Sequence, residues 1–170
     1  MIGDDRLAQA IDRQEITTLL HLYARGIDRC DLATLLAVWD TGATVDYGEG
    51  ALDAAGWSRG VLERLRPMAH TMHALSNIVI DLDGDGDGAR SETYCHAYHQ
   101  FAGEDGALRR MIVGGRYLDR LVRTPQGWRI AARTYVMDWN ENDASSCRFD
   151  GPFARFTTVG ARHPEDALYR

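Results

Sequence analysis

Several residues and motifs that would assign this chain to a functional class are scarce or missing. Its three cysteines, Cys30, Cys95 and Cys147, are far apart, and no CxxC pair occurs. The sequence therefore predicts neither a zinc site nor a disulfide framework, and favours reduced thiols that pack as small hydrophobic side chains. The GxSxG, Walker and GxGxxG motifs are also missing, so no common hydrolase or nucleotide-binding signature guides the interpretation.

Basic charge and long apolar runs are lacking as well. The net charge of −6 argues against a nucleic acid or an anionic membrane as a partner, because both attract basic surfaces. No apolar run approaches the ~20 residues of a membrane span. The N-terminus lacks the basic start and apolar core of a signal peptide, so we expect a cytoplasmic protein.

The length of 170 residues fits one domain with a core of its own. No repeat, low-complexity tract or Pro/Ser-rich linker divides the chain. We therefore expect a single domain over residues 1–170, with a core of about 5–140 and a polar C-terminal tail at 141–170.

Helical patterns occupy the first third of the chain. The first apolar stripe follows the offsets i, i+3, i+4, i+7 and i+11 and consists of Ile16, Leu19, Leu20, Tyr23 and Ile27. Asp31 is the expected N-cap of a second helix that reaches about Trp39. A third helix is predicted from Asp53 to about Arg66, where Pro67 stops it.

The pattern changes to strands from His70 onward. After a short candidate at 43–47, four strands are predicted at 73–80, 92–101, 110–122 and 128–139. Turn-forming residues connect the four, which indicates an antiparallel meander. Gly114-Gly115 lies inside a predicted strand and indicates a bulge or a sharp bend.

Helices that precede strands indicate an α+β fold. We expect the N-terminal helices to pack on a strongly curved antiparallel sheet. Together they would form a cone-shaped α+β barrel that encloses a pocket.

The segment Asp81–Glu92 fits the EF-hand calcium pattern letter by letter. A calcium loop needs flanking helices and usually an apolar residue at its eighth position, whereas the flanks here are β-rich and that position is Gly88. A Gly/Asp hairpin explains the same residues, so we expect a turn and no calcium site.

Five motifs follow one another in an order that is typical of one family. In chain order they are the segments Tyr23–Asp31, Trp39-Asp40, His70–Asn77, Asp83–Asp85 and Gly127–Ile130. Their order and spacing over about 5–139 resembles the SnoaL-like proteins of the NTF2-like superfamily. Within it, the closest branch is that of scytalone dehydratase, hexachlorocyclohexane dehydrochlorinase and bile-acid 7α-dehydratase.

This resemblance implies a His–Asp dyad, whose positions here are Asp28 and His73. It also implies a pocket tyrosine five residues before the Asp, at Tyr23, and favours a second histidine on the following strand, at His96. Enzymes of this branch use no metal and no organic cofactor. The superfamily also contains isomerases, polyketide cyclases, epoxide hydrolases and non-catalytic subunits and binding proteins, so fold resemblance alone does not choose the activity.

A His–Asp pair suits the removal of a proton from carbon. Histidine titrates near neutral pH, and a carboxylate on one ring nitrogen fixes the tautomer and stabilises the imidazolium. In an ideal helix, Asp28 would lie about 100° from the centre of the apolar stripe, so it would face inward only if the helix ended near Gly26. The alternative is a surface aspartate and a strand-end His73 that never meet.

Other polar side chains on the strands have both a functional and a packing interpretation. Alternation places Tyr94, His96 and Tyr98 on one face and Cys95, Ala97, His99 and Phe101 on the other, and either row could line the pocket. Asn77 shares a face with His73 and could orient a substrate oxygen. His70 would lie on the opposite face from His73, which disfavours a two-histidine metal site.

Arg133 is predicted to share a face with Tyr135 and Trp139. An inward Arg133 could stabilise a departing anion, whereas the alternative is an exposed strand arginine. Trp39, which closes the second helix, is a further candidate for the pocket wall.

We therefore predict a cofactor-independent lyase, of dehydratase or dehydrohalogenase type, that acts on a small, hydrophobic, cyclic molecule. His73 would take the proton and Asp28 would orient it. The predicted substrate-binding residues are Tyr23, Trp39, Asn77, His96 and Arg133, and no metal ligand is predicted. The alternatives are an isomerase or cyclase in the same pocket, or a non-catalytic binding protein or dioxygenase-β-subunit-like chain. A curved sheet with an exposed outer face also suggests a homodimer or homotrimer.

Overall fold

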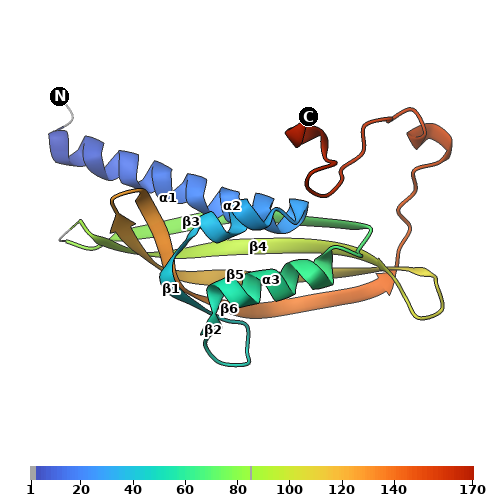
Figure 1. Ribbon diagram of the computed structural model, residues 1–170, viewed down its shortest axis with the longest axis horizontal. Helices are drawn as coiled ribbons and strands as arrows, with labels where there is room; N and C mark the ends of the chain where they lie inside the picture. Colours follow the sequence, from blue (N-terminus) through green and yellow to red (C-terminus); the bar gives the residue numbers. More distant parts are fainter. Residues whose placement is uncertain (1–2, 85) are drawn as a thin grey trace.

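The computed structural model describes residues 3–84 and 86–170 as two layers, with three helices on one face of a single sheet (Figure 1). The helices are α1 (Asp4–Arg29), α2 (Leu32–Ala37) and α3 (Ala54–Leu65). The predicted cap at Asp31 is confirmed, since its side chain accepts a hydrogen bond from the Thr34 N–H. Asp53, where the third helix was predicted to start, accepts one from the Gly56 N–H and caps α3. None of the helices in the described residues is long and apolar enough to cross a membrane.

The strands are β1 (Trp39–Asp46), β2 (Leu52–Asp53), β3 (His70–Leu82), β4 (Gly88–Ala102), β5 (Leu108–Thr124) and β6 (Gly127–Ala144). They are hydrogen-bonded in the order β2-β1-β6-β5-β4-β3. The predicted meander is confirmed, because β3 to β6 pair with their neighbours in antiparallel fashion. Two features were not predicted, namely the short β2 and the parallel pairing of β1 with β6.

The core lies between the helices and the sheet. The predicted stripe of α1 is buried there, with Ile16 and Leu20 fully inaccessible to solvent. α1 continues through Gly26 to Arg29. A Cβ atom at Gly26 would lie 3.0 Å from the backbone nitrogen of Leu35. This glycine therefore allows the backbone of α2 to pack close to α1.

A bulge at Gly114-Gly115 bends the sheet, as the sequence predicts. The β5–β6 register shifts there, so that Gly114 faces Trp139 whereas Gly115 faces Met137, and Asp138 is the extra residue. A Cβ on Gly114 would lie 2.1 Å from the Trp139 ring, which only glycine avoids. Further register shifts occur in the β1–β6 and β3–β4 pairs and again between β5 and β6. Such shifts curve strands and contribute to the cone shape.

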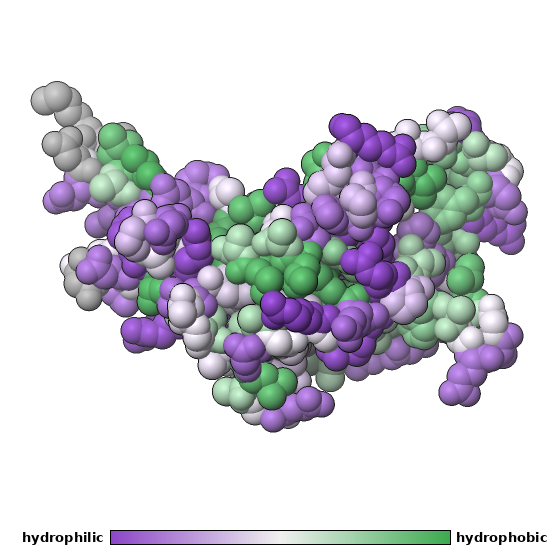
Figure 2. All heavy atoms as spheres, viewed as in Figure 1, coloured by the Kyte–Doolittle hydropathy of each residue, from purple (hydrophilic) through white to green (hydrophobic). Residues whose placement is uncertain are grey.

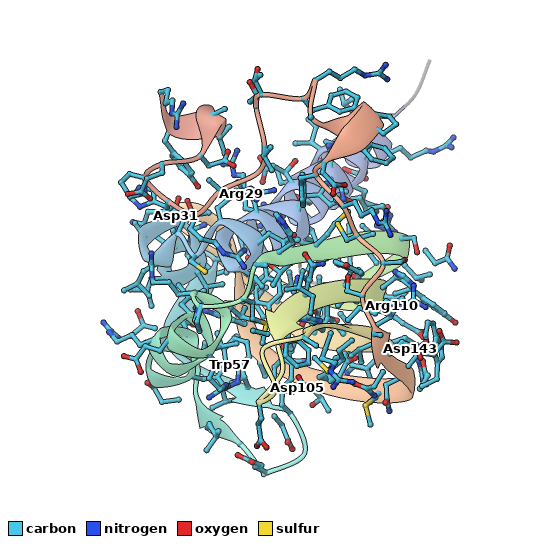
Figure 3. The ribbon with its side chains drawn as sticks, turned by 90° about the vertical axis from the view of Figure 1, so that its right-hand side faces the viewer. Arg29, Asp31, Trp57, Asp105, Arg110 and Asp143 are labelled. Atoms are coloured by element: carbon cyan, nitrogen blue, oxygen red, sulfur yellow. The ribbon has the colours of Figure 1, made fainter. Side chains whose placement is uncertain are left out.

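The C-terminal segment does not remain a free polar tail. β6 itself extends to Ala144, beyond the boundary predicted at residue 140. The chain then leaves the sheet, turns back and reaches the C-terminal end of α1, above the labelled Arg29 and Asp31 (Figures 1 and 3). Hydrophobic residues gather on its outer part (Figure 2), where Phe149, Phe153 and Phe156 are about half exposed.

The segment Asp81–Glu92 connects β3 and β4 through a turn, which confirms the predicted hairpin. The backbone N–H of Asp83 donates to the Gly88 carbonyl at 2.9 Å and closes the turn; Asp85 lies outside the described residues. Glu92 accepts a hydrogen bond from Arg116 at 3.1 Å.

Calcium should therefore not bind this hairpin with micromolar affinity. The twelfth position of the loop, Glu92, belongs to a strand and is paired with Arg116, so it is not preorganised as a bidentate ligand. Isothermal titration calorimetry of the protein with calcium should give no binding heat in the micromolar range. A saturable micromolar isotherm that disappears in Asp83→Asn would contradict this interpretation.

Candidate functional site

A cavity of about 200 Å³ lies between the helices and the concave face of the sheet. Its walls are mainly aromatic and apolar, and its polar side chains come from both layers. The lining residues are Tyr23, Ile27, Tyr47, Trp57, Val61, Arg64, Leu65, His73, Cys95, Ala97, His99, Val113, Tyr117 and Tyr135. Trp57, labelled in Figure 3, is supplied by α3.

His73 and Asp28 meet at the wall of this cavity. The Asp28 carboxylate binds His73 twice: one oxygen lies 2.7 Å from the ring Nδ1, and the other accepts the His73 backbone N–H at 2.8 Å. The side chain of Asp28 is only 10% exposed. We call this arrangement the Asp28–His73 pair.

The Asp28 carboxyl is ionised at neutral pH. Burial acts to raise its pKa, but hydrogen bonds from the His73 ring and backbone, the charge of His73 and the Thr71 hydroxyl together hold that pKa below its ordinary value. With Asp28 ionised, Nδ1 must be the protonated nitrogen of a neutral His73. The lone pair is then on Nε2, which suits the ring to act as a base.

The expectation that α1 must end near Gly26 for Asp28 to reach His73 is wrong. α1 runs to Arg29, and Asp28 is still helical. Asp28 can contact His73 because β3 is the edge strand of the sheet and packs beside α1. Asp28 therefore needs to point toward the strand edge and not toward the centre of the sheet.

His99, and not His96, is the second histidine of the cavity. His73 pairs with Ala97 across β3 and β4, and paired residues share a face, so the Cys95, Ala97 and His99 row faces inward. The His99 and His73 rings lie 5.3 Å apart in an edge-on arrangement. The expected site residue His96 is exposed on the outer face, with its ring 5.7 Å from that of Trp139.

Burial keeps His99 neutral. Desolvation, followed by the neighbouring His73, lowers the pKa of His99 to about 4. Its Nδ1 is buried and has no hydrogen-bond partner within the described parts of the chain. A buried unpaired nitrogen beside a cavity is available to a ligand or a water molecule.

Four tyrosine hydroxyls form a further polar group at the cavity. The Tyr23 and Tyr47 hydroxyl oxygens lie 2.7 Å apart, which is a hydrogen bond. Burial raises the pKa of Tyr23, raises those of Tyr47 and Tyr117 well above the ordinary value, and raises that of Tyr135 to about 12. All four hydroxyls therefore remain protonated and can donate hydrogen bonds.

Arg133 points inward, but it lies beneath the tyrosines rather than in the cavity wall. It forms two hydrogen bonds of 2.7 Å with Asp119, and both side chains are completely buried. Its guanidinium carbon lies 3.9 Å from the centre of the Tyr23 ring and 4.0 Å from that of Tyr117. The alternative of an exposed strand arginine is wrong, and direct contact between Arg133 and a substrate in the cavity is not supported.

Three other predicted placements need correction. Trp39 is buried below the cavity and donates through its indole N–H to Ser58 at 2.9 Å. Asn77 is exposed with φ of 47° at a register shift, so strand alternation fails there and Asn77 does not share the inner face with His73. Trp139 is turned outward, away from the face of Arg133, because Asp138 is the extra residue of the β6 bulge.

The two histidines at the start of β3 lie in different surroundings. His73 lines the cavity, whereas the His70 ring lies 4.9 Å from that of Phe149 in the C-terminal segment. Among the described residues, no group of three or more His, Cys, Asp and Glu side chains is placed to hold a metal ion.

Comparison with known proteins identifies one family model and a relative that covers most of the chain. A model of the SnoaL-like domain matches residues 8–134. An uncharacterized protein of Mycobacterium tuberculosis is 34% identical over 133 residues, which cover 75% of this chain and 86% of the relative.

Two solved structures have the same fold. One is a candidate scytalone dehydratase from Novosphingobium aromaticivorans, with a TM-score of 0.69 and 18% identity over 83% of this chain and 92% of the other. The second is the hexachlorocyclohexane dehydrochlorinase LinA-type3 from Novosphingobium barchaimii, with a TM-score of 0.71 and 14% identity over 86% and 99% of the two chains.

The buried Arg133–Asp119 pair should be important for stability. Asp119→Asn would leave the Arg133 charge buried without its counter-ion, and breaking such a pair costs about 3–5 kcal/mol of unfolding free energy. Urea denaturation should show this loss.

The exposed pair of Arg110 and Asp143, 3.3 Å apart and labelled in Figure 3, provides the matched control. Asp143→Asn should cost less than about 1 kcal/mol. Equal losses in the two variants would contradict the assigned role of the buried pair.

Proposed function

The chain belongs to the SnoaL-like domain family, and on that premise we propose that it is a cofactor-independent lyase. It removes the elements of water or of a hydrogen halide from a small, hydrophobic, cyclic molecule. The observation that carries the proposal is the doubly hydrogen-bonded Asp28–His73 pair at the wall of a largely apolar cavity.

His73 is the base in this reaction. Its Nε2 takes a proton from a carbon next to the one that bears the leaving group. The electrons of the broken C–H bond form the new double bond, and the leaving group departs with the electrons of its own bond. The ionised Asp28 stabilises the imidazolium that forms and keeps the ring in the productive tautomer.

The protonated tyrosines support the departure of the leaving group. Tyr23 and Tyr47 present hydroxyls at the cavity, and donors aimed at a developing negative charge stabilise it. A halide leaves as the anion, and the proton stays on His73 until solvent removes it. A hydroxyl leaves as water and needs a proton, which the His73 imidazolium supplies.

The cavity limits the size of the substrate. Cavities of about 150 Å³ accommodate a benzene ring in other proteins, and this one measures about 200 Å³. Its walls include five aromatic residues of the two layers, namely Tyr23, Tyr47, Trp57, Tyr117 and Tyr135. A single substituted ring therefore fits the size and the polarity of the site.

The variants His73→Ala and Asp28→Asn test the mechanism. Screening cyclic alcohols, cyclic halides and hydroxy-enones should identify a substrate, and His73→Ala should then lose at least about 10³-fold in kcat. Asp28→Asn should lose about 10²–10⁴-fold, because the amide no longer fixes the required tautomer. His96→Ala is the matched control and should retain activity, since His96 lies on the outer face.

Two results would exclude this mechanism. The first is a substrate whose turnover is unchanged in His73→Ala. The second is a ligand that binds the cavity without any turnover and whose affinity changes only modestly in His73→Ala, which is the behaviour of a binding protein.

We also propose that further copies of the chain cover the outer face of the sheet. That face exposes hydrophobic side chains on four strands, namely Met72, Val79, Tyr94, Leu118 and Trp139. Large hydrophobic side chains exposed together on one face are typical of interaction sites.

Light scattering coupled to size-exclusion chromatography should give two or three times the chain mass of 19.0 kDa. Trp139→Glu should shift the protein toward the monomer, because it places a charge on the covered face. Leu7→Glu, at a somewhat more exposed position of α1, should leave the mass unchanged. A monomeric wild-type protein would refute this assignment.

A further inference from the structure

The returning C-terminal segment is bound to the end of α1 by specific polar contacts. The His163 N–H donates to the Arg29 carbonyl at 2.6 Å, and Arg29 donates to the Ala161 carbonyl at 3.2 Å. Tyr169 donates through its hydroxyl to Asp31 at 2.9 Å. The segment thus has a defined position over Arg29 and Asp31 (Figure 3).

Arg162 makes the most extensive contacts of this segment. Its guanidinium donates four hydrogen bonds to groups on three different parts of the fold. The acceptors are the Asp28 carbonyl, the Thr71 hydroxyl at 2.8 Å, the Leu65 carbonyl at 3.2 Å and the Met68 carbonyl at 3.0 Å. One side chain therefore joins the end of α1, the end of α3 and the start of β3.

Two of these acceptors directly flank the Asp28–His73 pair. One is the carbonyl of Asp28 itself, whose carboxylate holds the His73 ring. The other is Thr71, which lies two residues before His73 on the same strand and the same face. Arg162 thereby bridges the helix that supplies the carboxylate and the strand that supplies the histidine.

The charge of Arg162 fits its surroundings. Asp28 lies in the last turn of α1, and Leu65 is the last residue of α3. The C-terminal ends of helices carry partial negative charge, which disfavours an additional carboxylate such as that of Asp28. A guanidinium on a carbonyl at each of the two helix ends offsets this repulsion, and its planar fork can serve several acceptors at once.

We propose that Arg162 is a positioning residue of the active site. It holds α1 and β3 at the separation at which the Asp28–His73 pair is formed, and it acts from behind the pair, from a second hollow formed by β3, β4 and the C-terminal segment. This inference rests on the function proposed above for its kinetic consequence, whereas its effect on the geometry of the pair can be measured without any substrate.

The test compares Arg162→Ala and Arg162→Lys with Tyr169→Phe in the full-length protein. Tyr169→Phe removes another anchor of the same segment, at Asp31, and leaves the contacts of Arg162 in place. The first readout is the proton NMR resonance of the hydrogen-bonded His73 Nδ1–H, assigned by its loss in His73→Ala. It should be sharp in the wild type and in Tyr169→Phe, and shifted or broadened in Arg162→Ala.

The second readout is kinetic. Small displacements of catalytic groups cost up to about 10²-fold in rate, so kcat of Arg162→Ala should fall at least about 10-fold relative to Tyr169→Phe, with KM changed less than about threefold. Arg162→Lys should be intermediate, because an ammonium keeps the charge but cannot reach all four acceptors.

Three results decide the outcome. If Arg162→Ala melts at a lower temperature than Tyr169→Phe but keeps the His73 resonance and kcat, Arg162 is only a structural anchor and the proposal is wrong. If Arg162→Ala does not fold, Arg162→Lys decides, and an unchanged resonance in that variant overturns the proposal. If the wild type turns over no substrate, the proposed function fails, while the NMR comparison still tests the positioning role.

Discussion

The candidate site depends on the two hydrogen bonds between the Asp28 carboxylate and His73. One of its oxygens accepts the His73 backbone N–H and the other meets the His73 ring. The first contact fixes the strand against the helix, and the second fixes the ring on that strand. Because the group that orients the ring also holds its backbone, the imidazole has little freedom to tilt. Such double attachment is how a site on regular elements reaches the precision that proton transfer requires.

The polarity of the cavity follows from what is buried beneath it. Arg133 and Asp119 neutralise each other below the tyrosines, so a full positive charge stands close to two tyrosine rings without being exposed to the cavity. The hydroxyls above stay protonated because burial raises their pKa values. Apart from Arg64, the cavity therefore offers the neutral tyrosine donors and the neutral His99 beside the Asp28–His73 pair. This separation suits a reaction in which charge develops only at the base and at the leaving group.

The sequence predicts the elements of this fold well, because hydrophobic periodicity and turn residues are local signals. The α1 stripe, the cap at Asp31 and the four-stranded meander depend on such signals. β2 has only two residues and the β1–β6 pair joins distant segments, so neither leaves a local pattern. The absence of a local signal also explains why the site was predicted only in part. Alternation divides β4 into two rows but does not say which row is inside, and the pairing of His73 with Ala97 is what places His99 inward. Asn77 and Trp139 are misplaced because bulges interrupt the alternation on which their prediction relied.

The contacts of the C-terminal segment affect what membership of the family says about the site. The SnoaL-like match ends at residue 134, whereas Arg162 ties together two helix ends and a strand that all lie inside the match. A shortened chain, or a diverged relative that keeps residues 8–134 and loses the C-terminal segment, would still be classified in the same family. It would nevertheless lack four hydrogen bonds at the rear of the Asp28–His73 pair. Family membership is thus defined by residues 8–134, whereas the rigidity of the Asp28–His73 pair depends partly on the C-terminal segment. That segment can be gained or lost independently of the family domain.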